Sequence, residues 1–413
     1  MQVEIRRSII SGRRPAPPSV AVAHRAIIAA SFADGQSLVW PVFPSASLDA
    51  TISICNQIGA DIMVGDGVAD IIGGGEIVPK DILDCAESNT TLKLFMGIFS
   101  HLPVEVRFVG KGKLLETNLR PFTYFIDYYS GYTFNPSSSL PLQLRGPIQN
   151  EEIKYPPLLG TQFLSGLILG APLNPQTTGI AIDGTFKDPH CLHETIRIMK
   201  QAGIDFVADY DDLIVIQGGQ GFLPLGDFEV PKNKKAASYL LLAGAVAGKC
   251  TVEGISDYPR LEAVLSHFGA VVKSEESSIS ASTSFLKGSD FDLSTAKELA
   301  CHVLVLACLA EGQSRLLGFQ KLPFHIQERL KRLKFELSKM GASIIEIPEG
   351  FLVEGATLHG ADLDCSKDPN IAMSCAAAAL CAQGPTTINN AEWAEKIFPG
   401  FFRELALLGA IIR

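Results

Sequence analysis

Residues 16–35, APPSVAVAHRAIIAASFADG, are the stretch around which the rest of the chain is best interpreted. The stretch opens with two prolines, which cannot continue a helix backwards, and closes on an Asp-Gly pair typical of turns. Between them, residues 25–32 are rich in alanine and isoleucine, which predicts a buried helix packed closely through small residues. We expect His24 and Arg25 at its start, where free N–H groups and a guanidinium would form an anion pocket. The alternative is that Arg25 is a solvated first-turn charge.

Length and composition indicate a globular protein of two domains. The chain has 413 residues, of which 47% are hydrophobic and 19% charged, which favours buried helix over disorder. Its net charge of −9 argues against nucleic acid as a partner, but a local basic pocket would still bind small anionic substrates. We expect a monomer or a small homo-oligomer.

Cysteine usage and apolar runs indicate the cellular setting. Nine cysteines are scattered without a CxxC pair, which is typical of a reduced, cytoplasmic protein. The longest apolar runs, at 239–248, 299–310 and 371–382, fall short of the roughly 18 residues that span a bilayer. We therefore expect these runs to be core helices and expect no membrane partner.

One pattern recurs six times along the chain: an amphipathic helix, a glycine, and a short apolar strand. Glycine suits the end of a helix because it accepts a left-handed backbone. The marker glycines follow one another at spacings of 66 to 72 residues and are Gly59, Gly131, Gly203, Gly269, Gly341 and Gly409. A small-residue helix that runs into a strand precedes each marker. Each unit is therefore predicted to be an α/β repeat of the β-α-β-α-β-β type.

The six units group three and three. A Gly/Pro-rich loop at 221–228 separates the groups, and the opening strand, at 3–10, is expected to close the second group. We predict a first lobe at 17–226 and a second lobe at 1–16 plus 227–413, so that the chain crosses between them twice. A cleft between two such lobes is the expected ligand site.

Seven segments spread over nearly the full length carry a family resemblance. They are HRAIIAASFADG at 24–35, SNTTLKLF at 88–95, LRPFTYFID at 119–127, TQFLSGLILGAPL at 161–173, AASYLLLAGAVAG at 236–248, ERLKRLKFELSKMGA at 328–342 and KIFPGFFRELALLGA at 396–410. Together they resemble the 5-enolpyruvylshikimate-3-phosphate (EPSP) synthase family, the 3-phosphoshikimate 1-carboxyvinyltransferases. The resemblance implies a two-lobed enolpyruvyl transferase fold, an inside-out α/β barrel with three repeats per lobe.

The resemblance also implies a reaction. The family joins phosphoenolpyruvate to a hydroxyl of shikimate 3-phosphate and releases phosphate, so phosphoenolpyruvate is the expected co-substrate and no cofactor or metal is expected. Two polyanions held side by side need a concentration of Lys and Arg, and carboxylates to move protons. The substrate-binding positions that match are Arg25, Arg120, Thr161, Gln162, Arg329 and Lys396, and Lys93 is a further substrate-binding candidate that stands where the family has an arginine. Glu298 falls where the family has the aspartate that takes the acceptor's proton. For each, the alternative is an ordinary surface charge or helix residue.

Other positions depart from the family pattern. The first-motif lysine and the serine after it are Val20 and Ala21, and one clamp arginine is Asn370. The proton-carrying glutamate is Ile326, and the lysine before it is His325. His325 is a candidate replacement acid because imidazole titrates near neutrality, and the alternative is a half-exposed loop histidine. The remaining departures are Asn89, Lys93, Gly160, residues 188–191 and Asn233.

These departures leave three hypotheses open. Each charged hydrogen bond to a phosphate is worth roughly 1.5–3 kcal/mol, so losing two clamp charges would weaken phosphoenolpyruvate binding by a few powers of ten. The chain is then a divergent transferase acting on a shikimate-like or other anionic polyhydroxylated ring, rather than an ordinary housekeeping EPSP synthase. The second hypothesis is elimination or rearrangement of a phosphorylated cyclitol without phosphoenolpyruvate, and the third is a non-catalytic binding paralogue. The joint survival of the matching charges favours an enzyme.

Three minor features complete the interpretation. Asp188, His190, Cys191 and His193 lie close together, but their spacing matches no familiar zinc pattern, so no metal site is predicted. The basic run at 232–235 is either solvated surface or an anion grip that replaces lost clamp charges. The cysteines of the 299–310 helix are expected to be core thiols, and His302 beside them carries no functional signal.

Overall fold

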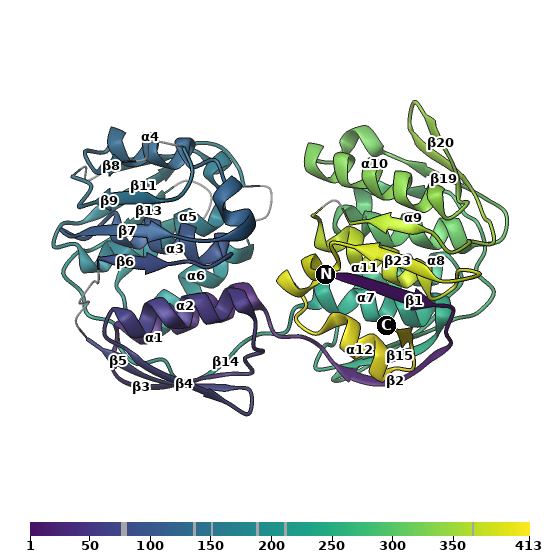
Figure 1. Ribbon diagram of the computed structural model, residues 1–413, viewed down its shortest axis with the longest axis horizontal. Coiled ribbons are helices and arrows are strands. Elements are labelled where there is room, and N and C mark those ends of the chain that lie inside the picture. The colour runs from purple at the N-terminus through teal and green to yellow at the C-terminus, as the bar shows by residue number, and fades with distance from the viewer. Residues whose placement is uncertain (76–80, 135–137, 150–151, 187–189, 210–212, 366) are drawn as a thin grey trace. The chain divides into compact units, whose positions relative to one another are not determined.

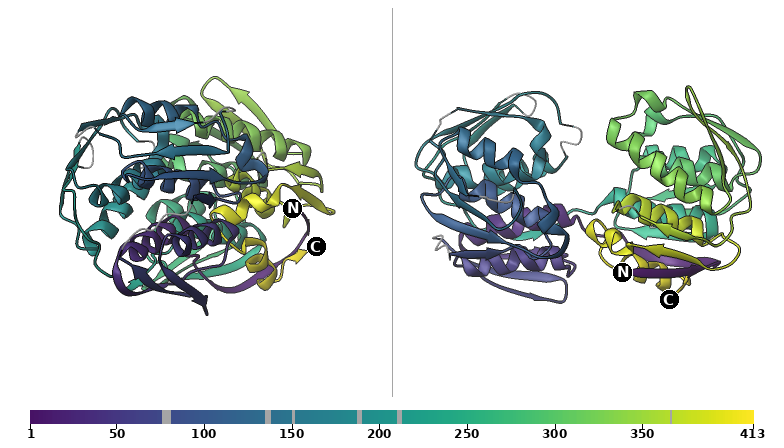
Figure 2. Two further views of the ribbon diagram at one scale, coloured as in Figure 1. Left: turned by 60° about the vertical axis from the view of Figure 1, so that its left-hand side comes forward. Right: turned by 45° about the horizontal axis from the view of Figure 1, so that its top comes forward.

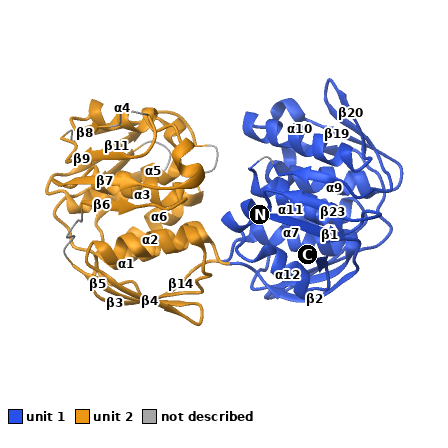
Figure 3. Ribbon diagram, viewed as in Figure 1, with its two compact units in different colours: residues 1–17, 232–413 blue, residues 18–231 orange. Residues whose placement is uncertain are grey.

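The computed structural model describes residues 1–413 except 76–80, 135–137, 150–151, 187–189, 210–212 and 366. The chain forms two compact units (Figure 3). Unit 1 comprises Met1–Pro17 and Lys232–Arg413, and unit 2 comprises Pro18–Pro231. Each unit has a hydrophobic core of its own, so the chain contributes two separate cores.

The second crossing between the units lies later than the sequence predicts. We expected it at 226–227, inside the Gly/Pro-rich loop, but the structure places it after Pro231. The reason is β14 (Gly226–Glu229), which pairs in parallel with β3 (Asp34–Trp40) and so forms an edge strand of a unit 2 sheet. Hydrogen bonding to a distant strand, which composition does not reveal, therefore keeps 227–231 in unit 2.

Unit 2 contains three four-stranded sheets and six longer helices among its described residues. Its helices, with η marking 3₁₀ turns, are α1 (Val20–Phe32), α2 (Ala46–Gln57), α3 (Asn89–Phe99), η1 (Gly112–Glu116), α4 (Arg120–Tyr128), η2 (Pro157–Leu159), α5 (Gly160–Gly170), η3 (Ala171–Leu173) and α6 (His190–Gln201). Its strands besides β3 and β14 are β4 (Asp61–Gly65), β5 (Val68–Gly74), β6 (Ile82–Asp84), β7 (Glu105–Val109), β8 (Tyr132–Phe134), β9 (Leu142–Arg145), β10 (Glu152–Tyr155), β11 (Thr178–Ile182), β12 (Phe206–Asp209) and β13 (Leu213–Ile216).

Unit 1 repeats this plan with the two strands of the N-terminal segment added to its own. Its helices are α7 (Lys234–Ala247), α8 (Pro259–His267), η4 (Leu293–Leu299), α9 (Ala300–Leu309), η5 (Phe319–Lys321), α10 (Phe324–Lys339), α11 (Pro369–Ala379), η6 (Ala391–Lys396) and α12 (Phe401–Leu407). Its strands are β1 (Gln2–Arg6), β2 (Ile10–Pro15), β15 (Gly248–Glu253), β16 (Val271–Glu275), β17 (Ser278–Ser282), β18 (Phe291–Asp292), β19 (Gln313–Leu317), β20 (Ser343–Ile347), β21 (Gly350–Glu354), β22 (Asp362–Asp364), β23 (Thr386–Asn389) and β24 (Ile411–Ile412).

All six sheets share one topology, which confirms the predicted sixfold repeat. Each has four strands, with one parallel pair at an edge and two antiparallel pairs. The order β6-β7-β9-β8 is an example, and in chain order this repeat reads β-α-β-α-β-β. The first part of the opening segment closes the last repeat as predicted, because β1 pairs with β23 and β24. The single strand expected at 3–10 is wrong, because β1 ends at Arg6 and β2, which begins at Ile10, pairs with β15 of another sheet.

In each unit three helices lie inside and the strands form an outer layer, as the ribbon views show (Figures 1 and 2). The inner helices are α1, α3 and α5 in unit 2 and α7, α9 and α11 in unit 1, and nearly all their residues are buried. Small residues make this packing possible. A Cβ added to Gly166 of α5 would lie 2.1 Å from the backbone oxygen of Leu94 on α3, so this crossing requires glycine.

Helix α1 differs in one respect from its prediction. It begins at Val20, directly after Ser19, because the two preceding prolines prevent an earlier start. His24 and Arg25 therefore lie in its second turn, with side chains in the core, and the expected anion pocket at the helix start is wrong in that form. Asp34 and Gly35 also do not form the predicted turn, because β3 begins there. No described helix is both long and apolar enough to cross a membrane.

Candidate active site

Arg25 on α1 is the most deeply placed of the predicted site residues. Its side chain is 0% exposed. Nε donates to the hydroxyl of Thr195 on α6 at 2.8 Å, Nη2 donates to that of Ser165 on α5 at 3.0 Å, and Nη1 donates to the carbonyl of Ala21 at 2.6 Å. The guanidinium thus joins three helices of unit 2 through neutral acceptors.

The charge of Arg25 has no counter-ion among the described residues. No described carboxylate forms an ion pair with it, whereas burying an unpaired guanidinium is costly. Burial lowers the pKa of Arg25, and nearby Cys191 and Glu194 offset only part of that shift. A buried cation of this kind creates a positive potential that a bound anion would stabilise. Direct contact with a ligand requires the atoms that cover it to move.

The starts of α3 and α5 bring three further predicted residues together. Gln162 Nε2 donates to the Thr90 hydroxyl at 3.1 Å, which ties α5 to α3. Thr161 precedes it, half-buried, and its carbonyl accepts from Ser165, the partner of Arg25. Lys93 is half-buried with its ammonium 5.1 Å from the centre of the Phe122 ring, and burial lowers its pKa. Thr161, Gln162 and Lys93 are therefore linked to Arg25 through one set of packed helices.

Arg120 begins α4, two residues before Phe122. It is exposed, its Nε donates to the Ser138 hydroxyl at 2.7 Å, and no described carboxylate pairs with it. Phe122 packs edge-to-face on Phe163, the neighbour of Gln162, with ring centres 5.2 Å apart. Arg25, Lys93 and Arg120 are thus three cations of unit 2 without ion-pair partners among the described residues.

Arg329 in unit 1 is in the opposite electrostatic situation. Its Nε donates to Asp368 Oδ2 at 2.6 Å, and the two side chains are 20% and 19% exposed. Burial acts to lower the pKa of Arg329, but Cys301, Asp368 and Tyr239 outweigh it and raise the pKa. Burial acts to raise the pKa of Asp368, but the interaction with Arg329 holds the pKa of that carboxyl below its usual value. The predicted clamp cation is already paired.

Asn370, which stands where the family has an arginine, supports this pair. Its backbone N–H and its Nδ2 both donate to Asp368 Oδ1, at 2.8 and 3.0 Å, and its Oδ1 accepts from the Tyr239 hydroxyl at 3.1 Å. Asp368 is also the N-cap of α11. Arg329 is therefore neutralised by a carboxylate that Asn370 also holds.

Glu298 lies in η4, immediately before α9. Its side chain accepts from Arg260 Nη1 of α8 at 3.2 Å, and this ion pair is largely exposed on the arginine side. A proton acceptor for a hydroxyl has to be reachable and ionised, and a solvent-exposed pair of this kind is weak enough to exchange partners. The role of Glu298 as a base stays a prediction, and Arg260 is a partner that sequence reasoning missed.

His325 and Lys396 occupy exposed positions in unit 1. His325 is in the first turn of α10, beside the buried Ile326. Lys396 ends η6, and its ammonium lies 3.5 Å from the centre of the Trp393 ring, a cation–π contact. Both have further interactions within the chain. The roles assigned to them stay predictions.

Some predicted residues are not brought to this site or cannot be described. Asp188 lies outside the described residues, and His190, Cys191 and His193 are in the first turn of α6. Within the described ranges, no three His, Cys, Asp or Glu side chains are grouped to hold a metal. Sequence reasoning missed Ser165, although its place four residues after Thr161 puts both on one helix face. His302, for which the sequence shows no functional signal, is buried, and its Nε2 lies 2.8 Å from the Ser238 hydroxyl.

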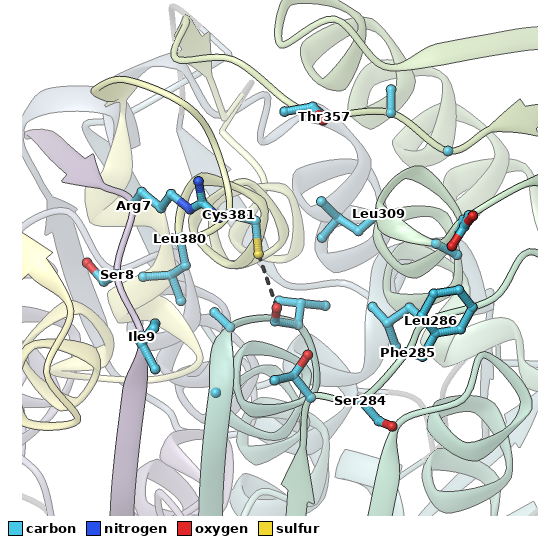
Figure 4. Close-up of a pocket in the computed structure, with 18 of the residues that line it drawn as sticks. Arg7, Ser8, Ile9, Ser284, Phe285, Leu286, Leu309, Thr357, Leu380 and Cys381 are labelled. Atoms are coloured by element: carbon cyan, nitrogen blue, oxygen red, sulfur yellow. Dashed lines mark hydrogen bonds between the residues drawn. The ribbon is translucent and has the colours of Figure 1, made fainter.

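A hollow of about 580 Å³ in unit 1 is lined by none of the predicted site residues. It lies at the C-terminal ends of α7, α9 and α11, the opposite ends from Asp368 and Glu298. Figure 4 shows its wall, where the Cys381 thiol donates to the Val246 carbonyl at 3.3 Å and Arg7 lies nearby. The candidate site is therefore defined by side-chain chemistry and not by this hollow.

Comparisons with known proteins agree with the resemblance. The model of the family EPSP synthase (3-phosphoshikimate 1-carboxyvinyltransferase) matches residues 6–405. A 3-phosphoshikimate 1-carboxyvinyltransferase of Methanocorpusculum labreanum is 30% identical over 100% of both chains, and one of Methanothrix thermoacetophila is 32% identical over 100% of this chain and 99% of its own. The solved structure of an EPSP synthase from Acinetobacter baumannii, 22% identical, superposes with a TM-score of 0.80 over 100% of this chain and 99% of that one, which shows a shared fold.

Proposed function

We propose a function from the premise that this chain belongs to the EPSP synthase (3-phosphoshikimate 1-carboxyvinyltransferase) family of transferases. In this proposal it transfers the carboxyvinyl group of phosphoenolpyruvate to a hydroxyl of a shikimate-like or other anionic polyhydroxylated ring, in the cytoplasm. A new C–O bond forms to the ring oxygen, the C–O bond to phosphate breaks, and inorganic phosphate leaves. No metal or organic cofactor takes part.

The proposal gives each predicted site residue one task. Arg25, Thr161 and Gln162 hold the ring substrate, and Lys93, Arg120, Arg329 and Lys396 hold anionic groups. Glu298 accepts the proton of the attacking hydroxyl, and His325 supplies the proton that the family's glutamate would otherwise carry. The observation that carries the proposal is the buried Arg25, whose charge no described carboxylate neutralises. A bound anion would offset the cost of that charge.

The finer part of the proposal is that the chain diverges from an ordinary EPSP synthase. Val20 stands in the place of the family's lysine, and Arg329 is paired with Asp368. Both features lower the positive charge available to phosphoenolpyruvate. We therefore propose that donor binding is weak and that the acceptor differs from shikimate 3-phosphate.

The test is incubation of the protein with phosphoenolpyruvate and a panel of shikimate-type acceptors, scored by phosphate release and product mass. A product heavier by the carboxyvinyl group supports transfer. Product from a phosphorylated ring without phosphoenolpyruvate would instead support elimination. Thermal stabilisation by a ring ligand without turnover would support a binding protein.

Glu298→Gln is expected to lower kcat by roughly 10²–10⁴-fold, because the amide cannot accept the hydroxyl proton. The substitution keeps the side-chain size, and the amide oxygen still accepts from Arg260, so folding should be unchanged. The measurement is steady-state phosphate release with the best acceptor of the panel. Arg260→Gln is the control and should leave kcat within a few-fold. Full activity of Glu298→Gln would show that Glu298 is not the base.

Val20→Lys is expected to tighten phosphoenolpyruvate binding by about tenfold or more, since a charged hydrogen bond to phosphate is worth roughly 1.5–3 kcal/mol. Val20 is the first residue of α1 and partly exposed, so a lysine there needs no rearrangement of the core. The measurement is titration calorimetry, with Val20→Gln as an uncharged control of similar length. Equal affinities of the two variants would show that this position does not face the donor.

A further inference from the structure

A closed ring of hydrogen bonds lies beside Arg25 and is not explained by the tasks given above. His24 Nδ1 is 2.7 Å from the Thr51 hydroxyl, and Thr51 is 2.8 Å from the Thr91 hydroxyl. Thr91 donates to Ser88 at 2.7 Å, and Ser88 is 2.6 Å from Ser47. Ser47 returns to His24 Nε2 at 3.3 Å and closes the ring. One imidazole and four hydroxyls thus connect α1, α2 and the start of α3.

The ring suits a neutral imidazole. Such an imidazole donates through one nitrogen and accepts through the other, and each hydroxyl also donates once, so five groups can close five hydrogen bonds. Burial, together with the neighbouring Arg25, lowers the pKa of His24 to about 3. His24 therefore stays neutral over the range in which enzymes of this kind operate, and we exclude it as an acid or base.

The ring holds the first turn of α3. Ser88 is the N-cap of α3, and its hydroxyl accepts from the backbone N–H of Thr91 at 3.1 Å. Thr90 lies between these two residues and accepts from Gln162, and Lys93 follows one half-turn later. Any shift of this turn therefore moves Thr90 and Lys93 relative to α1.

Consecutive residues of α1 thus reach in two directions. His24 contacts α2 and, through Thr51 and Ser47, α3, whereas Arg25 contacts α5 and α6. We propose that His24 is a positioning residue of the candidate site, which fixes Thr90 and Lys93 of α3 at a set distance from Arg25. The proposal rests on the proposed function, because it assigns a purpose to the site that these residues form.

The test compares His24→Leu, which is similar in size but makes no hydrogen bonds, with His24→Asn, whose amide can keep the bond to Thr51. Ile28→Ala is the matched control, because Ile28 is buried one turn further along α1 and its apolar side chain forms no hydrogen bond. The readouts are hydrogen–deuterium exchange of the Thr91 amide, and KM and kcat for the best acceptor of the panel with phosphoenolpyruvate.

We expect His24→Leu to speed exchange of the Thr91 amide by about tenfold or more and to raise KM about tenfold, with kcat changed less than threefold. Groups that bind ground state and transition state alike act on KM alone, which a general loss of stability would not reproduce. His24→Asn should bring the exchange rate of the Thr91 amide and KM most of the way back to the parental values. Ile28→Ala should change neither, even where its melting temperature falls as much as that of His24→Leu.

Two results would overturn the proposal: parental exchange at Thr91 in His24→Leu, or the same rise in exchange and KM in Ile28→Ala. If the parent protein transfers the carboxyvinyl group to no acceptor of the panel, the proposed function fails. The exchange experiment then still decides whether His24 fixes the first turn of α3.

Discussion

Replacing Arg25 with methionine is expected to weaken binding of the anionic substrate at least a hundredfold without lowering the free energy of unfolding. Each charged hydrogen bond to an anion is worth roughly 1.5–3 kcal/mol, and a guanidinium can make two. Two such bonds correspond to a factor of about 10² or more in affinity. The measurement is titration calorimetry with phosphoenolpyruvate and with the best acceptor of the panel, beside urea unfolding of the same sample.

The stability half of this expectation follows from the surroundings of Arg25. Its two hydroxyl acceptors keep other partners when it is removed, because Ser165 donates to the Thr161 carbonyl at 2.6 Å and Thr195 to the Cys191 carbonyl at 2.7 Å. Methionine fills a similar volume without a charge. Even a buried ion pair can often be replaced by apolar side chains with a neutral or stabilising effect of about 1–4 kcal/mol, and a buried charge without an ion-pair partner lacks the Coulomb attraction that offsets its desolvation.

Arg329→Met is the matched control from unit 1. It leaves Asp368 partly buried without its cation, so the protein should lose about 1–3 kcal/mol of stability. Both variants remove a guanidinium, which has no carboxylate partner at Arg25 and has one at Arg329. We expect Arg25→Met not to lower the free energy of unfolding and Arg329→Met to lower it. Equal destabilisation of both, with anion binding unaffected in Arg25→Met, would show that Arg25 serves the fold alone.

Acidification is expected to destabilise the protein steeply below about pH 6.5, through three buried histidines. Burial lowers the pKa of His24 and His302 to about 3 and that of His101 to about 4. The unfolded chain takes up protons near pH 6.5, while the folded chain does not. The stabilisation is therefore complete above pH 6.5 and is lost as the pH falls toward the folded-state values. Each histidine contributes up to about 1.4 kcal/mol per pH unit, or about 4 kcal/mol for three.

Urea unfolding between pH 7.5 and 5.0 measures this slope. Two carboxyl groups oppose this loss of stability, because burial raises the pKa of Asp49 and Glu395. The observed slope should therefore be smaller than about 4 kcal/mol per pH unit. His101→Leu removes one titrating group and should reduce the slope by about a third. Stability that is flat from pH 7.5 to 5.0 would show that these histidines are protonated in the folded protein.

The fold could be predicted because its signals are local and repeated. A marker glycine ends a helix before a short strand in each of six units, and a helix end that needs a left-handed backbone is encoded by the residue itself. The six sheets confirm the repeat. The boundary at 226 was wrong because β14 belongs to unit 2 by pairing with β3, nearly two hundred residues earlier. Pairing across that separation leaves no trace in local composition.

The site was predicted as residue types, without their partners. Arg25 and Arg329 are both arginines that match the family, and the sequence gives no reason to treat them differently. In the structure one lies among hydroxyls and the other against Asp368. The sequence indicates only the loss of a clamp arginine at Asn370, whereas in the structure its side chain bridges Tyr239 and Asp368. Burial and counter-ions decide the behaviour of a charge, and both depend on which helices pack together.

The sequence by itself therefore determined the sixfold repeat, the two-unit chain path and the family, because helix ends, apolar spacing and motif letters are written along the chain. Only the tertiary structure decided that Arg25 is a buried cation without an ion-pair partner among the described residues, that Arg329 is neutralised, and that His24 closes a ring from α1 to α3. These are properties of groups from distant segments, and electrostatic and hydrogen-bond energies depend on the distances between them rather than on their order in the chain.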